Sequence, residues 1–116
     1  MKKNNSEKIV AGIVIEGQKK GRILSFLTAN IKLKEKLDSG VYSGEAYFFK
    51  KKYRCAVFIP ENGRILEAHI LGFEGNLYGE KIKVRIIKKI RDIMKFNSDD
   101  CLMRQIRKDI EVIKKI

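Results

Sequence analysis

Hydrophobic and polar positions alternate over short stretches through most of this chain, and the alternation predicts a protein built mainly of β-strands. Residues 8–16 are β-branched and apolar, which is typical of a strand with both faces at least partly buried. In residues 81–86 basic and apolar side chains alternate, which indicates a strand with one solvated face. Residues 65–71 divide into an apolar face and a more polar face that carries Glu67 and His69.

Glycine-rich and basic segments separate these strands. Residues 40–60 are rich in aromatic and β-branched side chains on both sides of three lysines at 50–52, which predicts a hairpin with the lysines at its exposed tip. Residues 17–22 place two glycines around two lysines, and the backbone N–H groups of such a loop can approach phosphate. Turns of this kind commonly only join strands, so the segment by itself leaves both interpretations open.

The C-terminal residues change to a helical pattern. Ser98 is a favourable N-cap, Asp99 and Asp100 fall in the first turn, and two lysines close the last turn. Apolar residues recur at helical spacing along one face: Leu102, Ile106, Ile110 and Ile113. We therefore expect an amphipathic helix over about 98–115, packed against an all-β barrel.

Length and charge restrict the class of protein. The chain has 116 residues, which suits one domain spanning 1–116. No apolar run approaches the roughly 20 residues that cross a bilayer, and no cleavable apolar stretch precedes the first strand, so we expect a cytoplasmic protein. The net charge of +12 indicates an anionic partner, and nucleic acid, an anionic membrane and a nucleotide polyphosphate all qualify. The basic excess lies at the two ends, because residues 41–80 carry five basic and five acidic side chains.

Cysteine and histidine are too few for a zinc site or a Cys/His nucleophile pair. Cys55 and Cys101 have no metal-ligand spacing, and His69 is the only histidine in the chain. We expect the two cysteines to be buried or half-buried thiols.

Four motifs, in order and at nearly the right distances, resemble those of the riboflavin kinase family over residues 9–113. The first is a glycine-rich loop that runs into Thr-Ala-Asn at 28–30, and the second is Ser-Gly-Val-Tyr at 39–42. The third is a Glu-x-His strand at 66–71, followed by Leu-Tyr-Gly at 77–79. The fourth consists of matching positions before and within the helix: Ile90, Arg91, Lys95, Phe96, Ser98, Leu102, Gln105, Ile106 and Asp109. Any one motif is weak, but the four together are specific.

The resemblance implies a six-stranded antiparallel Greek-key barrel with a C-terminal α-helix packed against it. The implied activity is that of an ATP:riboflavin 5′-phosphotransferase, which makes FMN. ATP would lie under the first loops, and riboflavin between the barrel and the helix. The implied partners are riboflavin/FMN and ATP/ADP, with Mg²⁺ as cofactor and without a membrane or nucleic acid, and the expected form is a stand-alone monomer.

Site residues follow from the same resemblance. Thr28 and Asn30 would ligate Mg²⁺ that bridges the nucleotide phosphates, a role that suits hard oxygen ligands. Glu67 would accept the proton or hydrogen bond of the ribityl 5′-hydroxyl. The glycine-rich loop would line the phosphates through Gly17, Lys19, Lys20, Gly21 and Arg22. The isoalloxazine would be bordered by Arg91, Phe96 and Leu102.

Each assignment has a structural alternative. Residues 28–30 are common turn residues, and Glu67 can be a solvated charge on an exposed sheet face. His69 suits a structural or supporting role better than a catalytic one, and Arg91 can simply balance Asp92. The flanking motif matches favour the functional interpretation of residues 28–30.

Departures from the family pattern leave two other functions open. Ser25 and Leu27 replace a glycine and a proline, the segment before Glu67 is shortened to residues 59–64, and Ile93 replaces a frequent glutamate. These changes allow a flavin-binding module that has lost phosphate transfer. The net charge and the interleaved aromatic residues of 42–53 allow a basic barrel that binds RNA or DNA, which we favour least.

Overall fold

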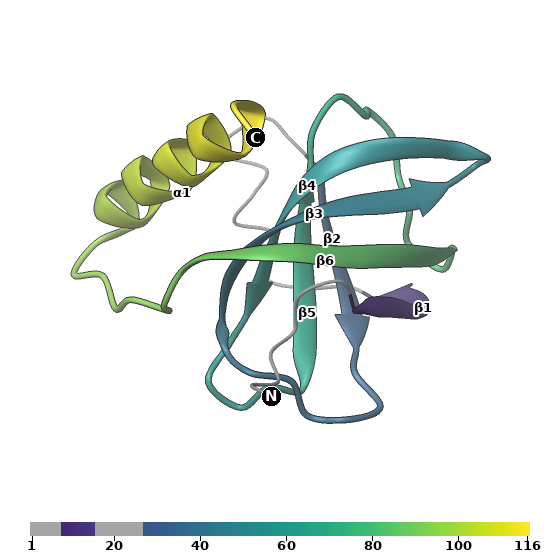
Figure 1. The fold of residues 1–116 in the computed structure, drawn as a ribbon, viewed down its shortest axis with the longest axis horizontal. Helices are drawn as coiled ribbons and strands as arrows, with labels where there is room; N and C mark the ends of the chain where they lie inside the picture. Colours follow the sequence, from purple (N-terminus) through teal and green to yellow (C-terminus); the bar gives the residue numbers. More distant parts are fainter. Residues whose placement is uncertain (1–7, 16–26) are drawn as a thin grey trace.

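The computed structural model describes residues 8–15 and 27–116, which form six strands and one helix (Figure 1). The strands are β1 (Ile9–Ile15), β2 (Leu27–Lys32), β3 (Gly40–Phe48), β4 (Lys51–Ile59), β5 (Ile65–Ile70) and β6 (Lys81–Arg91). The helix α1 (Asp99–Lys114) follows β6. The predicted hairpin at 40–60, the strand that carries Glu67 and His69, and the C-terminal helix are all present.

The six described strands close into an antiparallel barrel in the order β1-β2-β5-β4-β3-β6. Strands β3, β4 and β5 pair consecutively, and β6 returns to pair with β3. The spatial order β6-β3-β4-β5 is that of a Greek key. The predicted six-stranded Greek-key barrel with a C-terminal helix is therefore confirmed.

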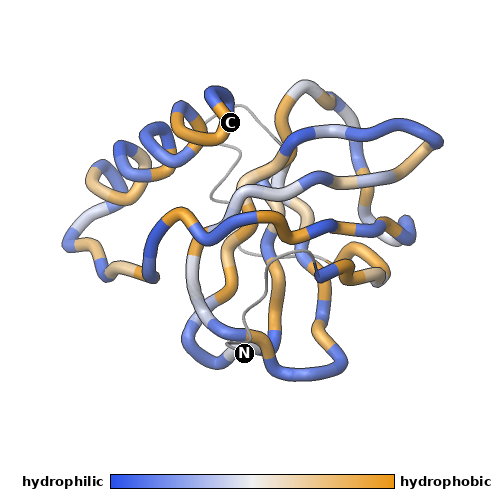
Figure 2. The backbone as a smooth tube through the Cα atoms, viewed as in Figure 1, coloured by the Kyte–Doolittle hydropathy of each residue, from blue (hydrophilic) through white to orange (hydrophobic). Residues whose placement is uncertain are grey.

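Alternate residues of each strand point into the barrel and form its core. Figure 2 shows hydrophobic and hydrophilic positions alternating along the strands. Ile31, Val57, Leu66, Ile70 and Ile86 are completely buried. Because side chains of a strand alternate between its two faces, the neighbours of these residues along the chain point out of the barrel.

Strand β1 is less covered than its sequence predicts. Val14 is buried, but Ile9 and Ile13 are 61% and 51% exposed. β1 pairs with β6 from Ile9 to Ile13, while α1 packs mainly on β4 and leaves the outer face of β1 open. The sequence predicted both faces to be at least partly buried, and the outer face of β1 is the less covered of the two, because β-branched residues favour the strand conformation whether or not both faces are covered.

Helix α1 is capped by side chains at both ends. The hydroxyl of Ser98 accepts a hydrogen bond from the backbone N–H of Cys101 at 3.2 Å. At the other end, the Arg54 guanidinium of β4 donates to the carbonyl oxygens of Ile113 and Lys114 at 3.3 and 2.9 Å. A cation there also offsets the negative end of the helix dipole. No helix within residues 8–15 and 27–116 is long and apolar enough to span a membrane.

The predicted apolar stripe of α1 is its packed face, since Ile106, Ile110 and Ile113 are buried and Leu102 is half-buried. The two thiols are free but differ in environment. Burial raises the pKa of Cys55 to about 12, which makes it an inert core residue. Cys101 is exposed, contrary to expectation, because it lies beside the stripe rather than on it.

The shortened segment between β4 and β5 folds as a tight turn. The N–H of Gly63 donates to the carbonyl of Pro60 at 2.9 Å, and Gly63 has a φ of +65°. A Cβ at this position would overlap the carbonyl oxygen of Leu37. The turn therefore requires glycine both for its left-handed backbone and for the close approach of a second chain segment.

Replacing Gly63 by alanine is expected to destabilise the fold by about 2 kcal/mol or more, because the left-handed conformation and the overlap both oppose a side chain. Gly72 is a matched control, since its φ is +81° but a Cβ there meets nothing within 4 Å. Gly72→Ala should cost about 1 kcal/mol, for the backbone alone. Urea unfolding measures both, and equal losses would show that the contact with Leu37 relaxes without cost.

Candidate active site on the outer face of β2 and β5

Three side chains singled out in the sequence project from two paired strands. In the antiparallel register of β2 and β5, Asn30 lies opposite Glu67 and Thr28 lies opposite His69. Residues directly opposite each other share a face of the sheet, with Cβ atoms about 4.5–5.5 Å apart. Since Ala29, between them in the chain, is buried in the core cluster, all four side chains point outward. The interpretation of residues 28–30 as an ordinary turn is therefore wrong.

Strand β4 extends this outward face on the other side of β5. Phe58 lies opposite Glu67, and Ala56 lies opposite His69. The face thus consists of two rows across three adjacent strands: Asn30, Glu67 and Phe58 in one, and Thr28, His69 and Ala56 in the other. We call these six residues the β2–β5–β4 face.

The polar groups of the β2–β5–β4 face are only partly satisfied. The hydroxyl of Thr28 is buried and has no hydrogen-bond partner among the described residues. The side chain of Asn30 is buried, whereas that of Glu67 is 27% exposed. One carboxylate oxygen of Glu67 lies 3.2 Å from Nε2 of His69. The side-chain oxygens of Thr28 and Asn30 and the solvent-accessible carboxylate of Glu67 are thus held next to one another on paired strands.

The oxygen atoms of Thr28 and Asn30 suit Mg²⁺ better than a metal ion whose ligands all come from protein side chains. The described residues contain no group of three or more His, Cys, Asp or Glu side chains that could hold a metal ion. The Thr28 hydroxyl and the Asn30 amide oxygen are hard, neutral ligands, the kind that Mg²⁺ accepts when phosphates and waters complete its shell. A buried hydroxyl that has no partner among the described residues needs an explanation, and a bound ion is one that fits these neighbours.

Arg91 is occupied by a buried ion pair that joins β6 to α1. Its Nε and Nη2 donate to the two carboxylate oxygens of Asp109 at 2.9 and 2.8 Å, and its Nη1 donates to the carbonyl oxygen of Asp92 at 2.9 Å. Gln105 donates to the same Asp109 carboxylate at 3.1 Å. The Asp92 carboxylate pairs instead with Lys89 at 2.6 Å, so the suggestion that Arg91 balances this charge was wrong.

The remaining predicted residues lie elsewhere or outside the described ranges. Phe96 is half-buried in the segment that links β6 to α1, and Leu102 is half-buried in the first turns of α1. The expected phosphate loop lies outside the described residues, and so does Ser25: the loop positions are Gly17, Lys19, Lys20, Gly21 and Arg22. Leu27 begins β2.

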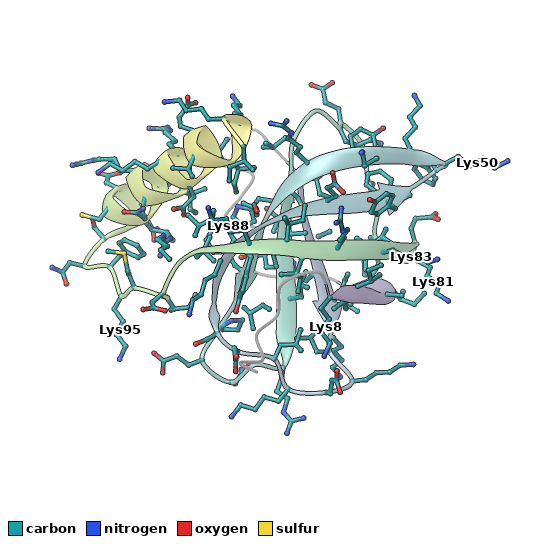
Figure 3. All side chains as sticks on the ribbon, viewed as in Figure 1. Lys8, Lys50, Lys81, Lys83, Lys88 and Lys95 are labelled. Atoms are coloured by element: carbon teal, nitrogen blue, oxygen red, sulfur yellow. The ribbon has the colours of Figure 1, made fainter. Side chains whose placement is uncertain are left out.

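Within the described part of the chain, the labelled lysines lie at separate places on the surface (Figure 3). Lys50 points away from the hairpin tip, Lys81 and Lys83 project near the start of β6, and Lys95 projects from the segment before α1 (Figure 3). The three lysines of the tip are exposed, as predicted. Such a distribution, unlike a continuous stripe, does not by itself mark a binding surface for a polyanion.

Sequence reasoning missed two contributions to this region. Phe58 belongs to the β2–β5–β4 face, and the signal was an aromatic residue at an outward position of β4. Asp109 holds Arg91, and the signal was a polar residue beside the apolar stripe of α1, between Ile106 and Ile110. A buried carboxylate at such a position requires a charged partner.

The chain is similar in sequence to proteins of one family. The family model described as flavokinase (riboflavin kinase) matches residues 5–116. The bifunctional riboflavin kinase/FMN adenylyltransferase of Buchnera aphidicola subsp. Schizaphis graminum is 42% identical over 117 residues, which cover 91% of this chain and 38% of the relative. The chain thus spans less than half the length of this relative.

Two solved structures share the fold. A chain described as a macrolide-efflux protein from Streptococcus pneumoniae superposes with a TM-score of 0.76 at 30% identity, covering 91% of this chain and 36% of that one. Riboflavin kinase from Trypanosoma brucei superposes with a TM-score of 0.65 at 23% identity, covering 92% of this chain and 74% of that one. Because the family model spans nearly all of the sequence and the barrel-and-helix fold agrees, the chain belongs to the riboflavin kinase family.

Proposed function

We propose that this chain is a riboflavin kinase, which transfers the γ-phosphate of ATP to the ribityl 5′-hydroxyl of riboflavin and releases FMN and ADP. The register of β2 and β5 is the observation that carries the proposal, because it sets Thr28, Asn30 and Glu67 side by side on one outer face. Phosphoryl transfer to an alcohol requires an acceptor for the hydroxyl proton and ligands for the cation that accompanies the phosphates. These three residues supply both.

Glu67 is the proposed proton acceptor. Its carboxylate takes the proton of the 5′-hydroxyl as the hydroxyl oxygen bonds to the γ-phosphorus. The bond between the γ-phosphorus and its bridging oxygen breaks, and ADP leaves with that electron pair. Because the Glu67 side chain is 27% exposed, the proton can then pass to solvent. Strand β5 is paired with β2 on one side and with β4 on the other, which keeps the carboxylate in place through this sequence.

Thr28 and Asn30 are the proposed ligands of Mg²⁺, which spreads the charge of the transferring phosphoryl group when it is bound. The Thr28 hydroxyl has no hydrogen-bond partner among the described residues, and this supports the role, because leaving a buried hydroxyl unpaired costs about 1–3 kcal/mol. By resemblance, we assign the nucleotide phosphates to the loop at residues 17–22.

We place riboflavin between the outer face of the barrel and α1, with Phe96 and Leu102 bordering the isoalloxazine. Both are half-buried apolar side chains at the junction of β6 and α1, which suits contact with a flat aromatic ligand. Arg91 belongs to the same border, where its ion pair with Asp109 fixes the position of the helix.

We infer that the protein acts as a monomer in the cytoplasm, where reducing conditions keep cysteines such as Cys55 and Cys101 as free thiols. The comparisons support the transfer reaction, and nothing in them favours a flavin-binding module without turnover or a nucleic-acid-binding barrel.

The decisive experiment incubates the purified chain with riboflavin, ATP and MgCl₂ and separates the flavins by chromatography. We expect FMN and ADP in equal amounts. Flavin binding without any FMN, across several divalent metals and nucleotides, would contradict the proposal and favour the module without turnover. Steeply salt-dependent binding of single-stranded RNA or DNA that flavin does not affect would favour the basic barrel instead.

Replacing Thr28 by valine separates stability from function. Valine keeps the volume but removes a buried hydroxyl that has no partner within residues 8–15 and 27–116, so the variant should be more stable than the wild type by about 1 kcal/mol. The Mg²⁺ concentration for half-maximal FMN formation should rise about tenfold or more, since a ligand worth at least 1.4 kcal/mol is lost. Thr28→Ser, which keeps the hydroxyl, is the matched control. An unchanged Mg²⁺ dependence in the valine variant would exclude Thr28 as a ligand.

A further inference from the structure

His69 is a buried histidine directly beside the proposed proton acceptor. Its side chain is 3% exposed, compared with 27% for that of Glu67. Both residues lie on β5, two positions apart, and therefore on the same outward face. Burying a polar ring on the outside of a barrel has a cost that needs a compensating interaction.

The surroundings of His69 fix its ring in one place. The ring lies against that of Phe58 in a tilted arrangement, with centroids 4.4 Å apart and planes inclined by 31°. The residue opposite His69 on β4 is Ala56, whose small side chain leaves room for this arrangement, and the residue opposite on β2 is Thr28. Contact between two aromatic rings adds to the stabilisation that burial alone provides. The imidazole is therefore packed against an aromatic side chain of β4.

One ring nitrogen of His69 lies close to the carboxylate of Glu67. Nε2 of His69 lies 3.2 Å from Oε1 of Glu67, although the N–H is not aligned for a full hydrogen bond. Catalytic contacts of this kind commonly tighten when substrate is bound. With Oε1 facing the imidazole, Oε2 is the oxygen left to meet a substrate hydroxyl.

We propose that His69 is a positioning residue for phosphoryl transfer, which holds the Glu67 carboxylate in one rotamer through Nε2–H and so presents Oε2 to the ribityl 5′-hydroxyl. This inference rests on the proposed function of Glu67. It assigns the ring proton to Nε2, because the carboxylate lies on that side. A long glutamate side chain has three rotatable bonds, so a fixed contact on one oxygen removes much of its freedom before the reaction begins.

A pair of variants tests the donor separately from the packing. His69→Gln places an amide N–H close to the position of Nε2, whereas His69→Leu fills the space without a donor. We expect the leucine variant to lose about 10- to 100-fold in kcat with KM for riboflavin and ATP changed less than about threefold, since misplacing a reacting group costs rate rather than binding. The glutamine variant should stay within about fivefold of wild type, because it restores one hydrogen bond. Equal kcat values for the two variants would overturn the proposal.

A structural readout keeps the test independent of activity. Crystal structures of the wild type and of His69→Leu should show a single Glu67 conformer in the first and several in the second. An unchanged, single Glu67 conformer in the leucine variant would overturn the positioning role even if kcat fell. If the wild type makes no FMN, the proposed function fails, while the conformer comparison still decides whether His69 positions Glu67.

Discussion

Replacing Glu67 by glutamine is expected to lower kcat for FMN formation by about 10²- to 10⁴-fold, the usual contribution of a general base. Glutamine has the same shape and accepts hydrogen bonds, but it cannot take the proton of the 5′-hydroxyl at neutral pH. Binding of riboflavin and ATP should change little, because the carboxylate is used mainly in the transition state. Steady-state kinetics followed by chromatography of FMN, together with flavin fluorescence titration, measure the two effects separately.

Glu61 offers a matched control for this substitution. It is an exposed glutamate in the turn between β4 and β5, so Glu61→Gln makes the same change of charge away from the β2–β5–β4 face. We expect this variant to keep wild-type kcat. If Glu67→Gln retained full activity as well, Glu67 would be a solvated strand charge, and proton transfer would have to use another group or water.

The fold could be predicted from the sequence because the patterns that mark its strands, turns and helix are local. Period-two alternation marks the strands, glycine marks the turns, and Ser98 with the following aspartates marks the start of α1. The exposed faces of Ile9 and Ile13 were not predictable in this way. Whether the outer face of a barrel strand is covered depends on where a distant helix packs. Strand propensity carries no information about that packing.

The site was predictable only in part, for a similar reason. The motif resemblance named Thr28, Asn30 and Glu67, but their side-by-side arrangement depends on the register between β2 and β5, which lie far apart in sequence. A shift of one residue would turn Glu67 into the core. The contact between His69 and Glu67 and the ion pair between Arg91 and Asp109 depend on rotamers and helix placement as well. Neither interaction can be predicted from the alternation of polar and apolar residues along one strand.

Removal of the Asp109 charge is expected to destabilise the protein strongly. The Asp109 side chain is 2% exposed and that of Arg91 is 15% exposed, and two hydrogen bonds join them. Breaking a buried pair from one side leaves an uncompensated charge, which costs about 3–5 kcal/mol. Asp109→Asn should therefore lower the free energy of unfolding by about this amount in urea titrations. Asp92→Asn is the control, because its solvent-exposed pair with Lys89 contributes little to stability.

A double variant then distinguishes two roles for Arg91. Replacing both partners by apolar residues, as in Arg91→Met with Asp109→Leu, should recover most of the stability lost in Asp109→Asn, because no buried charge is left unpaired. If Arg91 acts only by docking α1 against the barrel, the double variant should have the KM for riboflavin of the wild type. If Arg91 touches the flavin directly, KM should stay high although the fold is restored. A double variant as unstable as Asp109→Asn would show that the geometry of the ion pair, rather than its charge balance, holds the helix.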